Sequence, residues 1–145
     1  MDAQSYMNEI VDPTIGDFEV EPTSRRRAFL ACVATFHCID YLTHPKKSKI
    51  IRREFQKNRS FAVVDRVAHA FKHVASGNRN APYNPPLDVA AVFSRPPMMA
   101  GRAECGVSQC GDTVGGIAIW GEGDSDLLLV VKDAAEFLRT KMRPE

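Results

Sequence analysis

The chain has 145 residues, of which 44% are hydrophobic and 26% are charged. These values are ordinary for a folded globular protein, and the length predicts a single domain with a substantial hydrophobic core. The 19 basic and 18 acidic residues give a net charge of +1, so composition alone indicates no preference for a charged partner.

No apolar run approaches the roughly 18–20 residues that are needed to span a bilayer. The acidic, polar segment 1–12 lacks the basic and apolar regions of a secretory signal. We therefore expect a cytoplasmic protein with no membrane partner. The cysteines of such a protein are expected to be reduced, and Cys105 and Cys110 lack the second ligand pair that a zinc clip needs.

Residues 1–22 are expected to form an N-terminal tail or a short edge strand. Phe18 and Val20 alternate with charged residues, and Pro22 would end a strand there. The remaining residues, 23–145, are predicted to form one α+β domain.

The segment 23–76 is predicted to be helical. A first helix covers 24–43, because Pro45 disfavours helical backbone at the residue before it. A short amphipathic helix follows within 46–59, and a third helix covers 60–75. We expect these helices to form an antiparallel core.

The segment 88–131 is predicted to be the β part of the domain, because short β-compatible runs alternate there with Gly- and Pro-rich turns. These runs are 88–93, 101–107, 114–120 and 127–131. The last pair is expected to form a β-hairpin around an acidic loop, with a final helix over 132–142. Helices followed by a small antiparallel sheet and one more helix are typical of an α+β fold.

The four histidines lie on the first predicted helix, directly after it and on the third predicted helix. If these helices pack together, the His37–Asp40 pair would face a stripe at i, i+4 and i+8 formed by Asp65, His69 and His73. The candidate catalytic residues are Arg66, His73, His69, His37, Asp40 and Asp65.

Three interpretations of this constellation are open. The first, which the sequence favours, is a hydrogen-bonded polar network between the helices of a binding or interaction module. The second is RNA cleavage, with His69 or His73 as general acid or base and Arg66 stabilising the developing phosphorane. The third is a divalent metal site on facing helices. Its ligands would be His37, Asp65, His69 and His73. Because no HExxH or ExxH pair is present, we predict no metal and no cofactor.

The segment 46–59 carries seven bases against the single acid Glu54. The bases are Lys46, Lys47, Lys49, Arg52, Arg53, Lys57 and Arg59. Such a surface is either a solvated helix face or a docking site for phosphates. RNA or another polyanion is therefore the partner that this segment would bind.

The elements FHCIDYL and VVDRVAHAFKHV resemble those of a family of small bacterial proteins. Its members carry H-x-x-D-[WY] on one helix and D-x3-[NH]-x-x-K-H on a later one, followed by a glycine-rich β-hairpin and a final helix. The resemblance brings no known activity. It covers His37, Asp40, Tyr41, Asp65, His69, Lys72 and His73.

The segment 66–73 is also similar to the R-x4-6-H element of HEPN-type helical ribonucleases. These toxins and defence proteins cleave RNA without a metal, and they are usually symmetric homodimers. This resemblance implies that Arg66 and His73 would form the catalytic pair.

Overall fold

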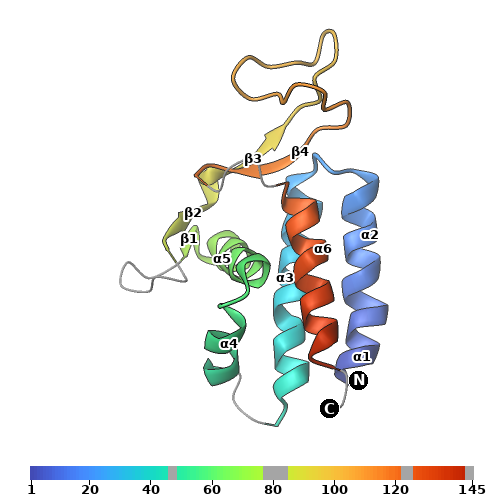
Figure 1. Ribbon diagram of the computed structural model, residues 1–145, viewed down its shortest axis with the longest axis vertical. Coiled ribbons are helices and arrows are strands. Elements are labelled where there is room, and N and C mark those ends of the chain that lie inside the picture. The colour runs from blue at the N-terminus through green and yellow to red at the C-terminus, as the bar shows by residue number, and fades with distance from the viewer. Residues whose placement is uncertain (46–48, 77–84, 122–125, 143–145) are drawn as a thin grey trace.

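The computed structural model describes residues 1–45, 49–76, 85–121 and 126–142. Helices build most of it, and small antiparallel strand pairs complete it, which confirms the α+β class (Figure 1). The helices are α1 (Ala3–Tyr6), a π-helical turn (Met7–Val11), α2 (Asp12–Val20), α3 (Arg25–Thr43), α4 (Lys49–Phe55), α5 (Arg59–His73) and α6 (Leu127–Thr140). The strands are β1 (Ala75–Ser76), β2 (Leu87–Asp88), β3 (Val92–Arg95) and β4 (Gly116–Ile119), with a 3-10 turn at Val89–Ala91.

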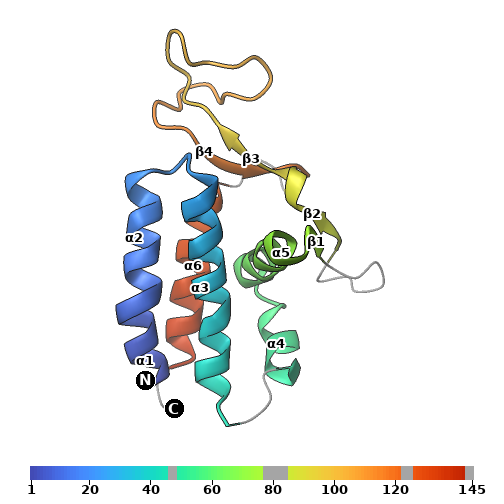
Figure 2. The ribbon, with the colours of Figure 1, turned by 180° about the vertical axis from the view of Figure 1, so that it is seen from behind.

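Helices α2, α3 and α6 stand side by side, and α2 runs antiparallel to α3 (Figure 1 and Figure 2). Helix α5 is seen almost along its axis in both views, so it crosses this bundle instead of running antiparallel to α3. The core lies where these helices meet, around the fully buried side chains of Phe18, Phe61, Leu127 and Leu138. In the part of the chain that the structure describes, no helix is both long and apolar enough to cross a membrane.

The N-terminal residues are neither a tail nor an edge strand, so that prediction is wrong. Met7, Val11, Ile15 and Phe18 are buried in the core, at the steps of three and four residues that one helical face requires. The alternation of Phe18 with Val20 was misleading, because Val20 is 80% exposed. Residues 1–22 therefore belong to the same hydrophobic core as the rest of the chain.

The predicted hairpin between 114–120 and 127–131 is also wrong. Leu127–Val131 forms the start of α6, where the Asp126 side chain accepts a hydrogen bond from the Leu128 N–H at 2.8 Å. A carboxylate at this position satisfies an N–H group that has no partner within the helix. The final helix therefore begins five residues earlier than the predicted start at 132.

Strand β4 pairs instead with β3, and Phe93 lies opposite Ala118 in the register of this antiparallel pair. The connection 96–115 consists of turns and contains no strand at 101–107. The β3–β4 pair lies across the end of the bundle at which α6 begins (Figure 1). At the opposite end of the bundle, α1 meets the last turns of α3 (Figure 1).

Candidate functional site

The two histidine-bearing helices do meet, although they cross. His37 of α3 and His69 of α5 line one cavity of about 150 Å³. The Phe36 ring lies next to both imidazoles, with ring centroids 5.1 Å from His37 and 4.8 Å from His69. No hydrogen bond or ion pair is found between these two histidines. The expected shared site is thus two polar sets, which border the same small cavity but share no hydrogen bond between His37 and His69.

Asp65 is the centre of the first of these polar sets. Its carboxylate is buried and accepts hydrogen bonds from Arg52 (Nη2–Oδ1 2.6 Å, Nε–Oδ2 2.9 Å) and from Gln56 (Nε2–Oδ2 2.5 Å). The Nδ1 atom of His69 lies 2.9 Å from the Asp65 Oδ1 atom and 2.8 Å from the Asp65 carbonyl oxygen. We call Arg52, Gln56, Asp65 and His69 the Asp65 cluster.

The partners of Asp65 keep it ionised. Burial raises the pKa of this carboxyl group, but the hydrogen bonds from His69, Arg52 and Gln56 outweigh burial, and the net shift lowers the pKa. The Arg52 guanidinium also lies over the Phe36 ring, 5.1 Å from its centroid. The Asp65 cluster therefore joins α4 to α5, and Arg52 also contacts α3 through the Phe36 ring. The Asp65 carboxylate stabilises this arrangement of helices.

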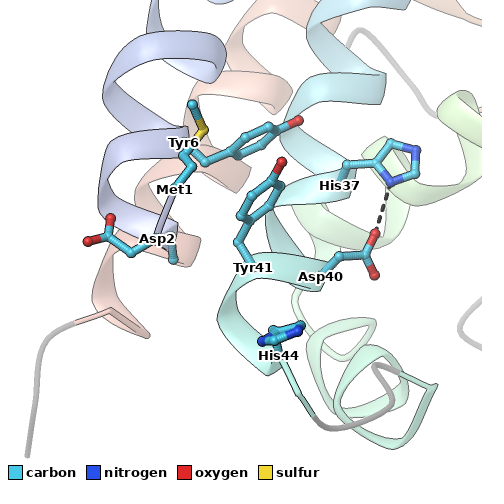
Figure 3. A pocket seen from close by; sticks show the side chains of 8 residues that line it. Met1, Asp2, Tyr6, His37, Asp40, Tyr41 and His44 are labelled. Atoms are coloured by element: carbon cyan, nitrogen blue, oxygen red, sulfur yellow. Dashed lines mark hydrogen bonds and ion pairs between the residues drawn. The ribbon is translucent and has the colours of Figure 1, made fainter.

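His37 and Asp40 belong to a separate, solvent-open groove of about 770 Å³ between α1 and the C-terminal half of α3 (Figure 3). The His37 Nδ1 atom lies 3.0 Å from the Asp40 Oδ2 atom, and about half of each side chain is exposed. His44, which follows α3, lines the same groove. We call this the α1–α3 groove. Its lining residues are Met1, Asp2, Ala3, Tyr6, His37, Asp40, Tyr41 and His44.

Two stacked tyrosines fix α1 against α3. The rings of Tyr6 and Tyr41 have centroids 4.1 Å apart and are inclined by 17°. The Tyr6 hydroxyl donates a hydrogen bond to the Ala34 carbonyl oxygen at 3.1 Å, and burial raises the pKa of Tyr6 to about 12. Tyr41 is 38% exposed, so part of its ring is presented to the groove.

Sequence reasoning missed Tyr6 and Asp2 as site residues, because residues 1–22 were expected to be a tail or an edge strand. The helical spacing of Met7, Val11 and Ile15 was the signal that would have placed this segment against the core. It would not have shown that Tyr6 stacks on Tyr41, because that contact joins segments far apart in the chain.

Two predicted catalytic residues remain. Arg66 is only 5% exposed, whereas His73 is exposed at the end of α5, with its ring centroid 6.3 Å from that of His69. Among the residues that the structure describes, no three His, Cys, Asp or Glu side chains are placed to hold a metal ion.

The predicted phosphate-binding surface is only partly free. Arg52 is engaged by Asp65, and the Lys57 Nζ atom lies 2.7 Å from the Glu54 Oε2 atom. The exposed bases in the described part of this surface are Lys49, Arg53, Lys57 and Arg59. Lys46 and Lys47 lie outside the described residues.

The buried thiols are poor nucleophiles. Burial raises the pKa of Cys32 strongly and that of Cys38 to about 12. Cys105 and Cys110 are exposed and free in the connection 96–115.

No protein-family model, curated protein or solved structure matches this chain. The two resemblances drawn from short sequence elements therefore stay predictions, and the function has to be argued from the geometry.

Proposed function

We propose that this protein is a binding module whose ligand site is the α1–α3 groove. The observation that carries the proposal is the division of the polar residues into two sets. The carboxylate of Asp65 is hydrogen-bonded by other residues of the Asp65 cluster. The side chains of the second set instead line the solvent-open α1–α3 groove, and they are His37, Asp40, Tyr41 and His44. The volume of about 770 Å³ falls within the range of about 300–1,000 Å³ that is typical of small-molecule sites.

The lining of the groove supports binding better than covalent catalysis. The part of the lining that the structure describes contains no serine, threonine or cysteine, which are the usual nucleophiles beside a His–Asp pair. The aromatic and polar side chains come from two elements that the Tyr6–Tyr41 stack holds in place. A site that is formed before the ligand arrives loses less conformational entropy on binding.

The ribonuclease alternative has less support from the geometry. It requires the Arg66 guanidinium to reach a phosphate, but this side chain is 5% exposed. It also draws on Arg52 and Lys57 as phosphate-binding bases, and both have acidic partners. The metal-binding alternative needs His37 beside Asp65, and these residues belong to the two separate sets.

The proposal is tested by NMR titration of the ¹⁵N-labelled chain with a panel of small cations, anions and neutral aromatic compounds. We expect at least one class to shift the backbone amide resonances of residues 37–44 saturably. His37→Ala should weaken that binding at least fivefold. His73→Ala is the matched control, because His73 is exposed but lies outside the groove, and it should leave binding unchanged.

Two results would contradict the proposal. One is the absence of saturable shifts at the groove with every class of probe. The other is cleavage of RNA in the presence of EDTA that His73→Ala abolishes and His37→Ala leaves intact, which would favour the ribonuclease.

A further inference from the structure

The charge of the α1–α3 groove differs from that of the chain. Among the described residues that line it are Asp2 and Asp40 but no lysine or arginine, although the chain has 19 of these bases. A hydrogen bond from the Ser5 backbone N–H lowers the pKa of Asp2, which keeps it ionised.

The two carboxylates stand on opposite sides of an exposed aromatic ring. Figure 3 shows the Tyr41 ring between Asp2, which precedes α1, and the His37–Asp40 pair on α3. Tyr6 covers one face of Tyr41 by stacking, and Tyr41 is still 38% exposed. The face of a tyrosine ring attracts cations, and the attraction is greater where ionised carboxylates complete the site.

On these grounds we propose that the groove binds a primary ammonium or guanidinium group at the Tyr41 ring, attracted by the carboxylates of Asp40 and Asp2 on either side of that ring. This inference rests on the proposed binding function and adds the chemical class of the ligand. The same chemistry occurs in a free alkylamine or guanidine and in a lysine or arginine side chain of a peptide.

Other ligand classes fit the groove less well. An anion would be repelled by both carboxylates and would find no lysine or arginine among the described residues of the lining. A neutral aromatic compound would use the Tyr41 ring but would gain nothing from Asp2 or Asp40. Dependence on the ligand's charge therefore separates the proposal from these alternatives.

The test compares two capped amino acids that differ in charge and hardly in shape, Nα-acetyl-arginine methylamide and the corresponding citrulline compound. In NMR titrations at low ionic strength, we expect the arginine compound to shift the resonances of residues 2–6 and 37–44 saturably. The citrulline compound should bind at least tenfold more weakly. Added salt should weaken the binding of the arginine compound, because the carboxylates are exposed.

Variants of the groove report on each part of the site. Asp40→Asn should weaken binding of the arginine compound at least fivefold, whereas Asp133→Asn, an exposed aspartate on α6 outside the groove, should leave it unchanged. Tyr41→Phe keeps the aromatic face and should retain binding, but Tyr41→Leu should weaken binding at least fivefold.

Ethylguanidinium and butylammonium as further probes identify the source of the cation. Equal affinity for these probes indicates a free small cation, and at least tenfold tighter binding of the arginine compound indicates a peptide.

The outcomes distinguish failure of this inference from failure of the proposed function. If the citrulline compound or inorganic phosphate binds in the groove as tightly as the arginine compound, the ligand class is wrong and the groove is still a binding site. If no probe of any charge shifts the groove resonances, both proposals are overturned. Retention of full affinity in Tyr41→Leu would also overturn the assignment of a cation to the tyrosine ring.

Discussion

The guanidinium of Arg52 donates two parallel hydrogen bonds to the carboxylate of Asp65, with Nη2–Oδ1 and Nε–Oδ2 distances of 2.6 Å and 2.9 Å. Such two-pronged, charge-assisted pairs are among the strongest polar contacts in proteins. No residue of α4 is fully buried, and its apolar contacts come from the partly buried Ile51 and Phe55. The position of α4 therefore depends on the Asp65 cluster together with the contacts of the Phe55 ring with Phe61 and Phe137.

Asp65→Asn should lower the free energy of unfolding at pH 7 by about 2 kcal/mol or more, because donors that now bind a buried carboxylate would meet a neutral amide. Urea denaturation followed by circular dichroism measures this loss. Asp133→Asn is the matched control, since Asp133 is exposed on α6, and it should change stability by less than about 0.5 kcal/mol. Equal effects of both variants would contradict the structural role of Asp65.

The same carboxyl group predicts a dependence of stability on pH. Its pKa is lower in the folded chain than the ordinary value of 3.8, so it stabilises the fold above pH 3.8 and this stabilisation is lost as the pH falls. The stability difference between the wild type and Asp65→Asn should therefore shrink between about pH 5 and about pH 2. Thermal unfolding across this range measures it, and a constant difference would contradict the lowered pKa.

Arg52→Lys should destabilise the chain by about 1 kcal/mol, because a lysine ammonium cannot donate the parallel pair of hydrogen bonds to Asp65. Arg53→Lys is a control on the same helix with the same chemical change at an exposed position, and it should be neutral. The partial exposure of Arg52, whose side chain is 29% exposed, limits the size of the effect because water screens the pair. Equal stabilities of the two variants would show that the parallel geometry is not needed.

Leu127 and Leu129 give a direct test of the helix that replaces the predicted hairpin strand. Leu127 is fully buried, whereas Leu129 is 62% exposed. Two residues apart in a strand, they would share a face, but in a helix they point about 200° apart. Leu127→Ala should therefore cost about 2–5 kcal/mol by urea denaturation and Leu129→Ala less than about 0.5 kcal/mol. Similar costs at both positions would favour a strand.

Gly115 is required where the connection 96–115 returns to β4. Its φ is +78°, and an added Cβ atom would lie 2.6 Å from the Arg95 carbonyl oxygen and 2.9 Å from the Thr23 Cγ2 atom. Gly111 has a similar φ of +82° but open space around it. Gly111→Ala should thus cost about 1 kcal/mol from the backbone alone, and Gly115→Ala about 3 kcal/mol or more. Equal costs in urea denaturation would show that the close contact at Gly115 is not rigid.

Sequence reasoning was most successful where the signals are local. Helices α3 and α5 were predicted because apolar residues recur at helical steps and Pro45 limits the first of them. It was wrong at Leu127–Val131, because a short run of apolar residues is compatible with either a strand or a buried helix. Only the cap at Asp126 and the burial of every fourth side chain distinguish the two.

Part of the candidate site was predictable for the same reason. His37 and Asp40 carry recognisable chemistry on one predicted helix, and both line the groove. Tyr6 and Asp2 were not predictable as their neighbours, because their segment meets α3 only in the folded chain. Arg52 was assigned to a phosphate-binding surface, because its neighbours in sequence are basic. The sequence does not show that Arg52 pairs with Asp65.

By itself, the sequence determined that the four histidines lie on α3, at the end of α3 and on α5, and that an α+β domain results. Periodicity, caps and helix breakers act over a few residues, so they can be read directly from the chain. Only the tertiary structure decided that Asp65 binds Arg52 instead of facing His37, and that Tyr41 meets Tyr6. Those choices depend on the angle at which α5 crosses α3 and on the packing of the N-terminal helices, which are set by side-chain contacts across the whole core.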